Sequence, residues 1–130
     1  RYPSFYRKLN SGMRALKTGL GSTWQDTAVL IFTEFGRTVR VNGTNGTDHG
    51  TAGAAMLAGG AVAGGRVISD WRGLAPRDLL DDRDLYPTTD VRALFKATLR
   101  EHMGLLDTDI EMTVFPQSAS IGALEGVFRT

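Results

Sequence analysis

Glycine is concentrated in the middle of this chain, and the clustering limits what the middle can fold into. Ten of the 16 glycines lie between Gly36 and Gly73. Glycine weakens helices and accepts the backbone angles of tight turns, so this region is predicted to form short strands joined by turns. Asn42-Gly43 and Asn45-Gly46 are typical turn dipeptides.

Helical and strand patterns lie before the glycine-rich region. Apolar residues at spacings of four, four, three and four predict a helix over residues 4–20 with one buried face. They are Phe5, Leu9, Met13, Leu16 and Leu20, with Ser4 as a possible N-cap and Gly21 as the stop. The apolar run Ala28–Phe32 predicts a strand covered on both faces. A helix followed by a buried strand is typical of a parallel α/β unit.

Further elements are predicted later in the chain. Ala52–Ala58 is either a strand or the start of a helix, and Val67–Ile68 is another short strand. A helix capped by Thr88 or Thr89 ends at Gly104. Its predicted buried stripe comprises Val91, Leu94, Phe95, Thr98, Leu99 and Met103. The tail is predicted to be coil with a brief strand.

Composition excludes several classes of protein. The chain has 130 residues, which fits one domain, residues 1–130, with a core of its own. The net charge of +1 gives no indication of nucleic-acid or anionic-membrane binding. The absence of cysteine excludes disulfides and thiolate metal sites. No apolar run approaches 18 residues, so no membrane span is predicted.

Four residues in the segment 33–50 are the chemical candidates. Glu34 and Arg37 follow the predicted strand, where α/β sheets place their ligands, and a glycine-rich loop then delivers Asp48 and His49. Carboxylate oxygens and imidazole nitrogens are common ligands of zinc, manganese and iron. Arg37 is a candidate for binding an anionic substrate through two hydrogen bonds.

Each candidate also has a structural interpretation. Asp48-His49 fits a surface turn in which Asp48 bonds its own backbone. Glu34 fits an ion pair with Arg37 or Arg40 that closes the strand end. A pair with Glu34 would also explain Arg37 without any role in substrate binding. No catalytic nucleophile is identified, because no Ser occupies a Gly-x-Ser-x-Gly context.

Two other groups favour structural roles. His102 lies near the end of a predicted helix, where an imidazole complements the helix dipole. Asp81, Asp82 and Asp84 lack the spacing of an EF-hand loop and are predicted to form a solvated acidic loop.

Several motifs together resemble the DUF1501 family. They are Glu34-Phe35-Gly36-Arg37-Thr38, Asn42-Gly43, Gly46-Thr47-Asp48-His49-Gly50, the glycine pairs at 59–60 and 64–65, Asp84-Leu85-Tyr86-Pro87-Thr88-Thr89-Asp90-Val91, the helix end at Leu99–Leu105, and Val114-Phe115-Pro116. The resemblance covers nearly the whole chain. It implies a bacterial protein similar to the alkaline phosphatase and sulfatase superfamily, exported to the periplasm or secreted.

The resemblance also implies a fold and a site. The chain, which begins at Arg1 rather than Met, would be the C-terminal part of a larger sulfatase-like α/β sheet flanked by helices. Thr47-Asp48-His49-Gly50 matches the superfamily's last metal-histidine loop. A metal-binding Asp-His pair is expected at the preceding strand end, where this chain has Glu34 and Phe35, and phenylalanine binds no metal. Aligning Asp48-His49-Gly50 with the Asp-His pair is less favoured, because the preceding segment is polar.

Two functions follow as hypotheses. The first is a hydrolase of phosphate or sulfate esters that depends on a divalent metal, most simply zinc, with His49, Asp48 and Glu34 as candidate ligands and Arg37 contacting a small anionic ester. It would be inactive as this chain alone. The second is a non-catalytic binding or structural protein on a decayed hydrolase fold. Uncovered sheet edges make a homo-oligomer a reasonable expectation.

Overall fold

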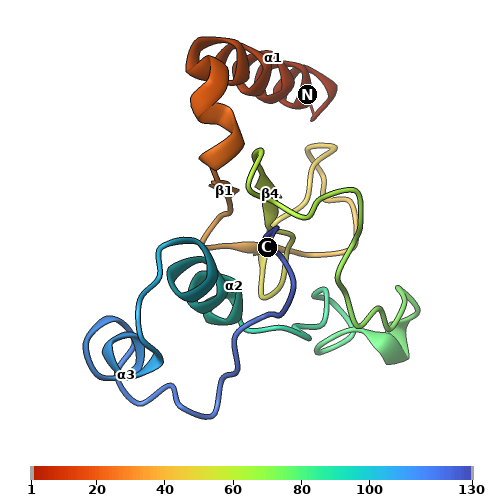
Figure 1. Cartoon of the computed structure of the whole chain (residues 1–130). Coiled ribbons are helices and arrows are strands. Elements are labelled where there is room, and N and C mark those ends of the chain that lie inside the picture. The colour runs from red at the N-terminus through yellow and green to blue at the C-terminus, as the bar shows by residue number, and fades with distance from the viewer. Residues whose placement is uncertain (1, 130) are drawn as a thin grey trace.

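The computed structural model describes residues 2–129, and a long helix opens the chain (Figure 1). α1 (Tyr2–Leu20) confirms the predicted helix, and the 3-10 helix η1 (Gly21–Asp26) follows it. Gly21 has φ 54°, the left-handed conformation that ends helices, so the predicted stop is also confirmed. Because α1 already begins at Tyr2, the predicted N-cap Ser4 lies inside the helix.

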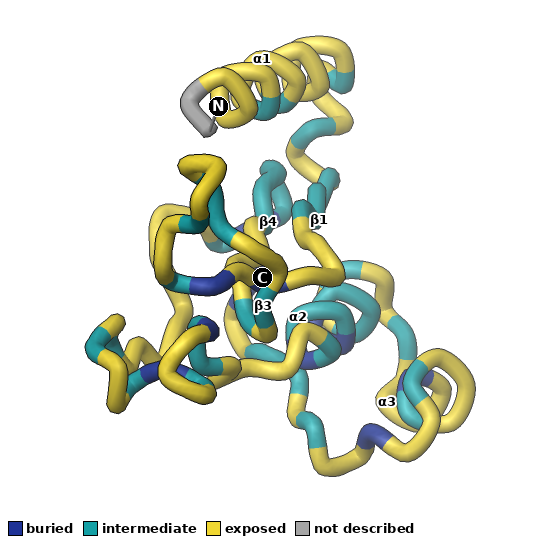
Figure 2. The backbone as a smooth tube through the Cα atoms, turned by 180° about the vertical axis from the view of Figure 1, so that it is seen from behind, coloured by how far each residue is buried: buried dark blue, intermediate teal, exposed yellow. Residues whose placement is uncertain are grey.

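The apolar face predicted for α1 is not buried. Phe5 is 61% exposed and Leu16 is 41% exposed, while Leu9, Met13 and Leu20 are half-buried. Figure 2 shows α1 as a largely exposed tube standing apart from α2. Amphipathic spacing therefore predicted the helix correctly but not its covering.

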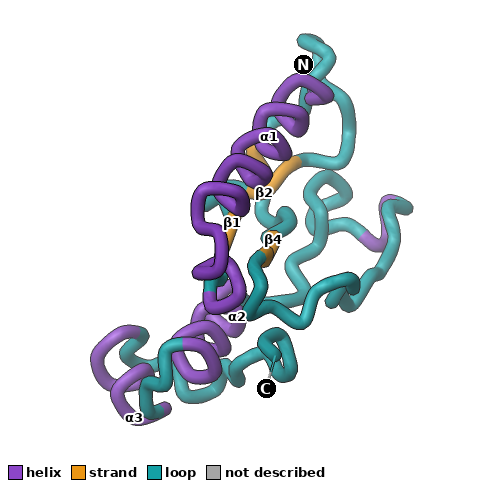
Figure 3. The backbone as a smooth tube through the Cα atoms, turned by 45° about the horizontal axis from the view of Figure 1, so that its top comes forward, coloured by secondary structure: helices purple, strands orange, loops and turns teal. Residues whose placement is uncertain are grey.

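Four short strands form two separate two-stranded sheets (Figure 3). β1 (Val29–Ile31) pairs with β4 (Met56–Ala58), with Leu30 opposite Leu57. β2 (Gly36–Arg37) pairs with β3 (His49–Gly50). Both pairs are antiparallel, so the mixture of helices and strands is confirmed but the predicted parallel unit is not.

Two strand predictions need correction. β1 is half-buried rather than covered on both faces, because its sheet contains only one other strand. Val67–Ile68 does not pair with any strand of residues 2–129, so the strand predicted there is not formed. Val67 is 90% exposed. By contrast, β4 resolves the alternatives for Ala52–Ala58 in favour of a strand.

The second long helical region begins at Asp90. Its carboxylate oxygen Oδ1 accepts a hydrogen bond from the Arg92 backbone N–H at 2.9 Å, so Asp90, rather than Thr88 or Thr89, is the N-cap of α2 (Val91–Ala97). The π-helical turn η3 (Thr98–His102) continues α2. Gly104, with φ 71°, follows as predicted.

The buried face of α2 differs from the predicted stripe. Ala93, Lys96 and Ala97 are buried, whereas Val91 is exposed, as is Met103 beyond η3. The Leu124 N–H donates to the Ala93 carbonyl at 3.0 Å, because small alanine side chains allow the C-terminal segment to approach the helix closely.

The remaining helical elements lie in loops. The 3-10 turn η2 spans Pro76–Asp78, and the short helix α3 (Asp107–Asp109) leads into the π-helical turn η4 (Ile110–Val114). The tail prediction missed α3 and η4. The brief strand predicted there is not formed within residues 105–129, where the only extended pairing is an isolated bridge between Phe128 and Val62.

The core lies where the C-terminal segment crosses the glycine pair and α2. Val62, Ala97, Val127 and Phe128 form a buried cluster, with Ala28, Leu57, Ala61, Ala123 and Leu124 packed against it. The Ala63 N–H donates to the Val127 carbonyl at 3.0 Å, and the Arg129 N–H to the Ala61 carbonyl at 2.8 Å. This core fixes one end of the chain segment that carries the candidate site.

Candidate functional site

The β2–β3 hairpin brings two of the predicted site residues together. Arg37 and His49 are directly opposite each other in the antiparallel register. Opposed residues in such a ladder project from the same face of the sheet, with Cβ atoms about 4.5–5.5 Å apart. The hairpin therefore places a guanidinium and an imidazole side by side, although the residues are twelve positions apart in sequence.

The hairpin is close-packed through two glycines. Gly36 and Gly50 are also register partners. A Cβ atom on Gly36 would lie 2.2 Å from the Ala52 carbonyl oxygen, and one on Gly50 would lie 2.6 Å from the Arg37 carbonyl carbon. Real Cβ atoms essentially never approach that closely, so any larger residue would force the strands to move.

Phe35 stacks on the His49 ring. The ring centroids are 4.4 Å apart and the planes differ by 7°. The imidazole nitrogens carry their lone pair and proton in the ring plane, so stacking fixes the ring without using either nitrogen. No hydrogen bond or ion pair within the described chain engages His49, and its side chain is exposed. Neither imidazole nitrogen has a partner within the described chain, so one can donate a hydrogen bond while the other accepts one or binds a metal.

Asn42 organises the loop that leads into β3. Its side-chain oxygen accepts hydrogen bonds from the Thr44 N–H and hydroxyl and from the Gly46 N–H, at 2.9–3.0 Å. Its amide nitrogen donates to Asp48 Oδ1 at 2.8 Å. The prediction recognised Asn42 only as a turn residue. The sequence did contain a signal for this bond. Asn42 and Asp48 are six positions apart, a spacing at which two polar side chains can bond across a short loop.

Backbone bonds hold Asp48 in place. The Asp48 N–H donates to the Thr38 hydroxyl at 3.1 Å, and the Thr38 N–H donates to the Asp48 carbonyl at 3.1 Å. Asp48 is exposed, as the surface-turn interpretation expects, but its carboxylate accepts from Asn42 rather than from its own backbone. One of its carboxylate oxygens, Oδ2, has no partner within the described chain.

Arg37 is held by its own loop. Its Nη1 donates to the Thr47 carbonyl at 3.0 Å, which leaves the other guanidinium donors exposed. Glu34 forms no ion pair with Arg37 or Arg40, so the structural interpretation that joined them is wrong.

Glu34 lies in a different setting from the other three residues. It precedes β2 at a bend and lines a large open cavity, together with Phe35 and Gly36. Arg37, Asp48 and His49 do not line that cavity. The structure thus unites Arg37 with His49, keeps Asp48 beside them in the chain, and places Glu34 along another surface.

A test of the donor set for a metal gives a partial match. Imidazole nitrogens and free carboxylate oxygens suit zinc and similar ions. Within residues 2–129, however, no three His, Cys, Asp or Glu side chains come close enough to hold one ion. The described residues therefore do not form a complete metal centre by themselves.

Asp84 holds the residue that follows the hairpin, Thr51, through a hydrogen bond. It is 4% exposed, so its inclusion in a solvated acidic loop was wrong, whereas Asp81 and Asp82 are exposed as predicted. Burial alone would raise the pKa of the Asp84 carboxyl, but hydrogen bonds from Arg83 and Thr51 outweigh it and lower the pKa below its usual value. The Thr51 hydroxyl donates to it at 2.9 Å and Arg83 Nε at 2.8 Å. The ionised carboxylate thus links Thr51, which directly follows β3, to the 80–84 turn.

His102 has a structural role, as predicted, though its main contact was not foreseen. Its ring stacks on buried Phe128 with centroids 5.3 Å apart. His102 therefore serves as a natural comparison for His49, because both imidazoles stack on a phenylalanine but only His49 belongs to the hairpin.

The fold and the hairpin together define a mixed α/β protein with an exposed arginine–histidine pair. A family described as proteins of unknown function, DUF1501, matches residues 2–114, and the chain belongs to that family. No curated protein and no solved structure matches the chain. No helix of the described residues is long and apolar enough to cross a membrane.

Proposed function

We propose that the β2–β3 hairpin binds the anionic group of a phosphate or sulfate ester, as part of a sulfatase-like hydrolase. The observation that carries this proposal is the register pair of Arg37 and His49 on one face. A guanidinium with free donors binds tetrahedral oxyanions through charge-assisted hydrogen bonds. An imidazole beside it supplies a second donor, or a ligand to a metal that itself contacts the anion.

In this proposal His49 supplies one metal ligand, with zinc as the favoured ion, and Asp48 Oδ2 is the next nearest candidate in the chain. A bound divalent metal would polarise an ester oxygen and stabilise the charge that develops on it. Phe35 would hold the imidazole in one orientation. Because the described residues complete no centre, the chain alone is expected to be inactive. Export to the periplasm or medium stays a prediction from the resemblance.

A direct test compares matched arginine and histidine variants of the chain. Inorganic phosphate and sulfate are titrated while the side-chain NMR signals of the arginines are followed. Arg37→Gln should abolish the response, whereas Arg40→Gln should leave it unchanged, because Arg40 is exposed on the loop between β2 and β3 and outside the paired strands. Equal responses in both variants would contradict the proposed anion site.

The metal part is tested separately by titrating zinc. His49→Ala should weaken binding, while His102→Gln should not, because His102 stacks on Phe128 away from the hairpin. Zinc affinity that is indifferent to His49 would remove the metal from the proposal and leave the anion site standing.

A second candidate function is a non-catalytic binding role on the same fold. The observation in its favour is that Phe35, which the resemblance aligns with a metal histidine, stacks on His49, while Glu34 lines a separate cavity. Elemental analysis of the purified protein distinguishes the two functions. A stoichiometric metal would exclude the non-catalytic role.

A further inference from the structure

The apolar face of α1 is only partly covered within the described chain, and none of its five stripe residues is fully buried. Among the elements of residues 2–129, α1 packs chiefly against η1, the 3-10 helix that follows it. Phe5 and Leu16, two residues of the apolar stripe, are exposed. A helix with such a stripe normally buries it against a partner surface.

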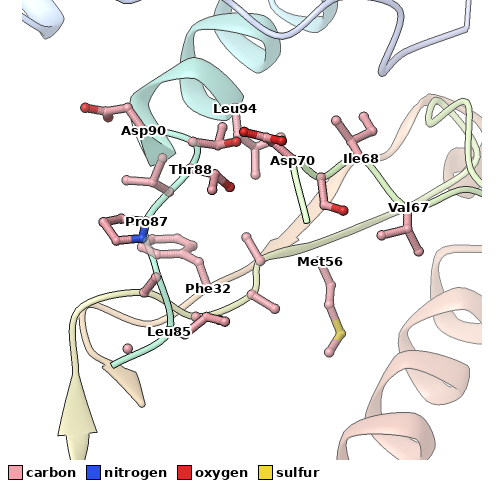
Figure 4. A pocket seen from close by; sticks show the side chains of 18 of the residues that line it. Phe32, Met56, Val67, Ile68, Asp70, Leu85, Pro87, Thr88, Asp90 and Leu94 are labelled. Carbon is pink, nitrogen blue, oxygen red and sulfur yellow. The ribbon is translucent and has the colours of Figure 1, made fainter. Parts of the chain in front are cut away.

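A second apolar surface is the cavity that Glu34 lines. It measures about 880 Å³ and opens between β4, the 66–73 segment and the start of α2 (Figure 4). Its apolar lining includes Phe32, Met56, Val67, Ile68, Trp71 and Leu94. Trp71 is 63% exposed and Phe32 is 55% exposed, which is unusual for large apolar side chains that line one hollow.

The helix α1 and the rest of the chain carry opposite net charges. Within Tyr2–Leu20, four residues are basic and none is acidic; the basic residues are Arg7, Lys8, Arg14 and Lys17. All 14 acidic residues lie after Leu20, where only 10 of the 15 basic residues lie, so residues 21–130 have a net charge of −4.

The same contrast holds inside the cavity. Its two arginines have contacts of their own, because Arg66 donates to the Gly126 carbonyl and Arg72 Cζ lies 4.0 Å from the centre of the Tyr86 ring, but both keep their positive charge. The carboxylates of Glu34 and Asp70 have no hydrogen bond or ion pair within residues 2–129. The cavity is therefore mainly apolar, and its lining holds four carboxylates, those of Glu34, Asp70, Asp78 and Asp90, against the two guanidiniums of Arg66 and Arg72.

We propose that α1 of one copy of this chain docks into the cavity of a second copy. The apolar stripe of the helix would cover the exposed aromatic and aliphatic lining, and Lys8 and Lys17, which flank the stripe at helical spacing, would meet the carboxylates. The helix of 19 residues is about 28 Å long, enough to span such a hollow. Reciprocal docking of two helices would give a closed dimer rather than an open chain of subunits.

A second copy is the favoured occupant because both complementary surfaces are present in one sequence. Helix-in-groove recognition uses anchors at positions i, i+4 and i+7 or i+8, the spacing of Phe5, Leu9 and Met13. The inference does not depend on the proposed function, since Arg37, Asp48 and His49 lie outside the cavity. Failure of anion or metal binding would leave it untouched.

Sedimentation equilibrium of the chain tests the association. We expect a concentration-dependent dimer that weakens as salt is added, because the contact is partly electrostatic. Leu16→Gln places a polar side chain where the apolar anchor would be buried, and it should raise the dimer Kd roughly tenfold. Thr18→Gln, on the polar side of the same helix, is the matched control and should leave the Kd unchanged.

Cross-linking tests the geometry, and the absence of cysteine makes it clean. Leu16→Cys and Ile68→Cys proteins are mixed and oxidised, and the mixed disulfide should exceed both homodimers. Met112→Cys, exposed on η4, replaces Ile68→Cys in the control and should give no excess.

Four results would overturn the inference. The first is a monomer at every concentration. The second is a dimer joined preferentially through two copies of Leu16→Cys, which would mean helix-to-helix packing. The third is a disulfide formed within a single chain that carries both cysteines, with no mixed dimer. The fourth is Leu16-dependent binding to phosphatidylglycerol vesicles without dimerisation, which would assign the helix to a lipid surface.

Discussion

Replacing Gly36 by alanine gives the sharpest test of the hairpin geometry. The new Cβ atom would lie 2.2 Å from the Ala52 carbonyl oxygen and 2.3 Å from the Ala52 nitrogen. Ordinary contact begins near 3.4 Å, so one backbone has to move by more than an ångström. That displacement strains the bond from the Arg37 N–H to the Ala52 carbonyl, now 3.0 Å long, and separates β2 from β3.

The expected cost follows from the overlap and the bond it breaks. Overpacking against backbone and losing one or two hydrogen bonds costs about 1–3 kcal/mol in the free energy of unfolding. For a chain of this length that lowers the melting temperature by roughly 4 °C for each kcal/mol. Gly43→Ala is the control, because a Cβ there meets nothing within 4 Å and its φ lies outside the left-handed region. It should stay within about 0.5 kcal/mol of the parent.

Two measurements are combined. Urea unfolding reports the stability, and the NMR shift of the His49 ring protons reports whether Phe35 still stacks on the imidazole. Gly36→Ala should move the His49 signals toward unstacked values and leave those of His102 on Phe128 unchanged. If Gly36→Ala matches Gly43→Ala in stability and keeps the His49 shift, the hairpin packing described here is wrong.

Three further predictions concern the supports of the fold. Ile110→Ala removes a fully buried side chain and should lower the free energy of unfolding by about 2–5 kcal/mol in urea titrations, whereas Met112→Ala, at an exposed position, should change it little. Asp90→Ala should cost about 1 kcal/mol through loss of the helix cap, and Asp90→Ser should restore most of that stability in thermal unfolding. The lowered pKa of the Asp84 carboxyl means that its stabilisation is present above the carboxyl pKa of the unfolded chain, near 4, and is lost as the pH falls through the folded value. Urea midpoints measured from pH 7 down to pH 3 should therefore fall further in the parent than in Asp84→Asn, and parallel curves would contradict the account of Asp84.

Local patterns predicted the elements better than their packing. The spacing of Phe5 to Leu20 predicted α1, and the apolar run Ala28–Phe32 predicted β1, because both signals depend on residues close in sequence. Neither signal contains the identity of the surface that covers an element. The apolar stripe of α1 is therefore not fully buried, and β1 pairs with an antiparallel strand rather than a parallel one.

The α2 stripe shows why the covering face is difficult to predict. The large residues Val91 and Met103 were expected inside, yet small Ala93 and Ala97 are buried. The C-terminal segment crosses the helix closely enough for its backbone to bond to Ala93, and only a small side chain permits that approach. Contact between residues about thirty positions apart leaves no trace in local periodicity.

The candidate site was predicted in its residues but not in its grouping. The sequence placed Glu34, Arg37, Asp48 and His49 in one segment, and the turn signals at Asn42 and Asn45 correctly indicated a reversal of the chain. The register of the reversal, which pairs Arg37 with His49, depends on the close fit of Gly36 against the Ala52 backbone and of Gly50 against the Arg37 backbone. That fit could not be read from a turn motif alone.

The stack of Phe35 on His49 bears on both functions considered for the hairpin. A phenylalanine cannot bind a metal, but at a centroid distance of 4.4 Å it fixes the plane of the imidazole and leaves both nitrogens at the exposed edge. Arg37 on the same face supplies a permanent positive charge, whose guanidinium is only partly engaged by the Thr47 carbonyl. In the proposed function this pair would bind oxyanions with or without a metal, so anion binding, rather than catalysis, is the part of the proposal that the hairpin geometry supports most directly.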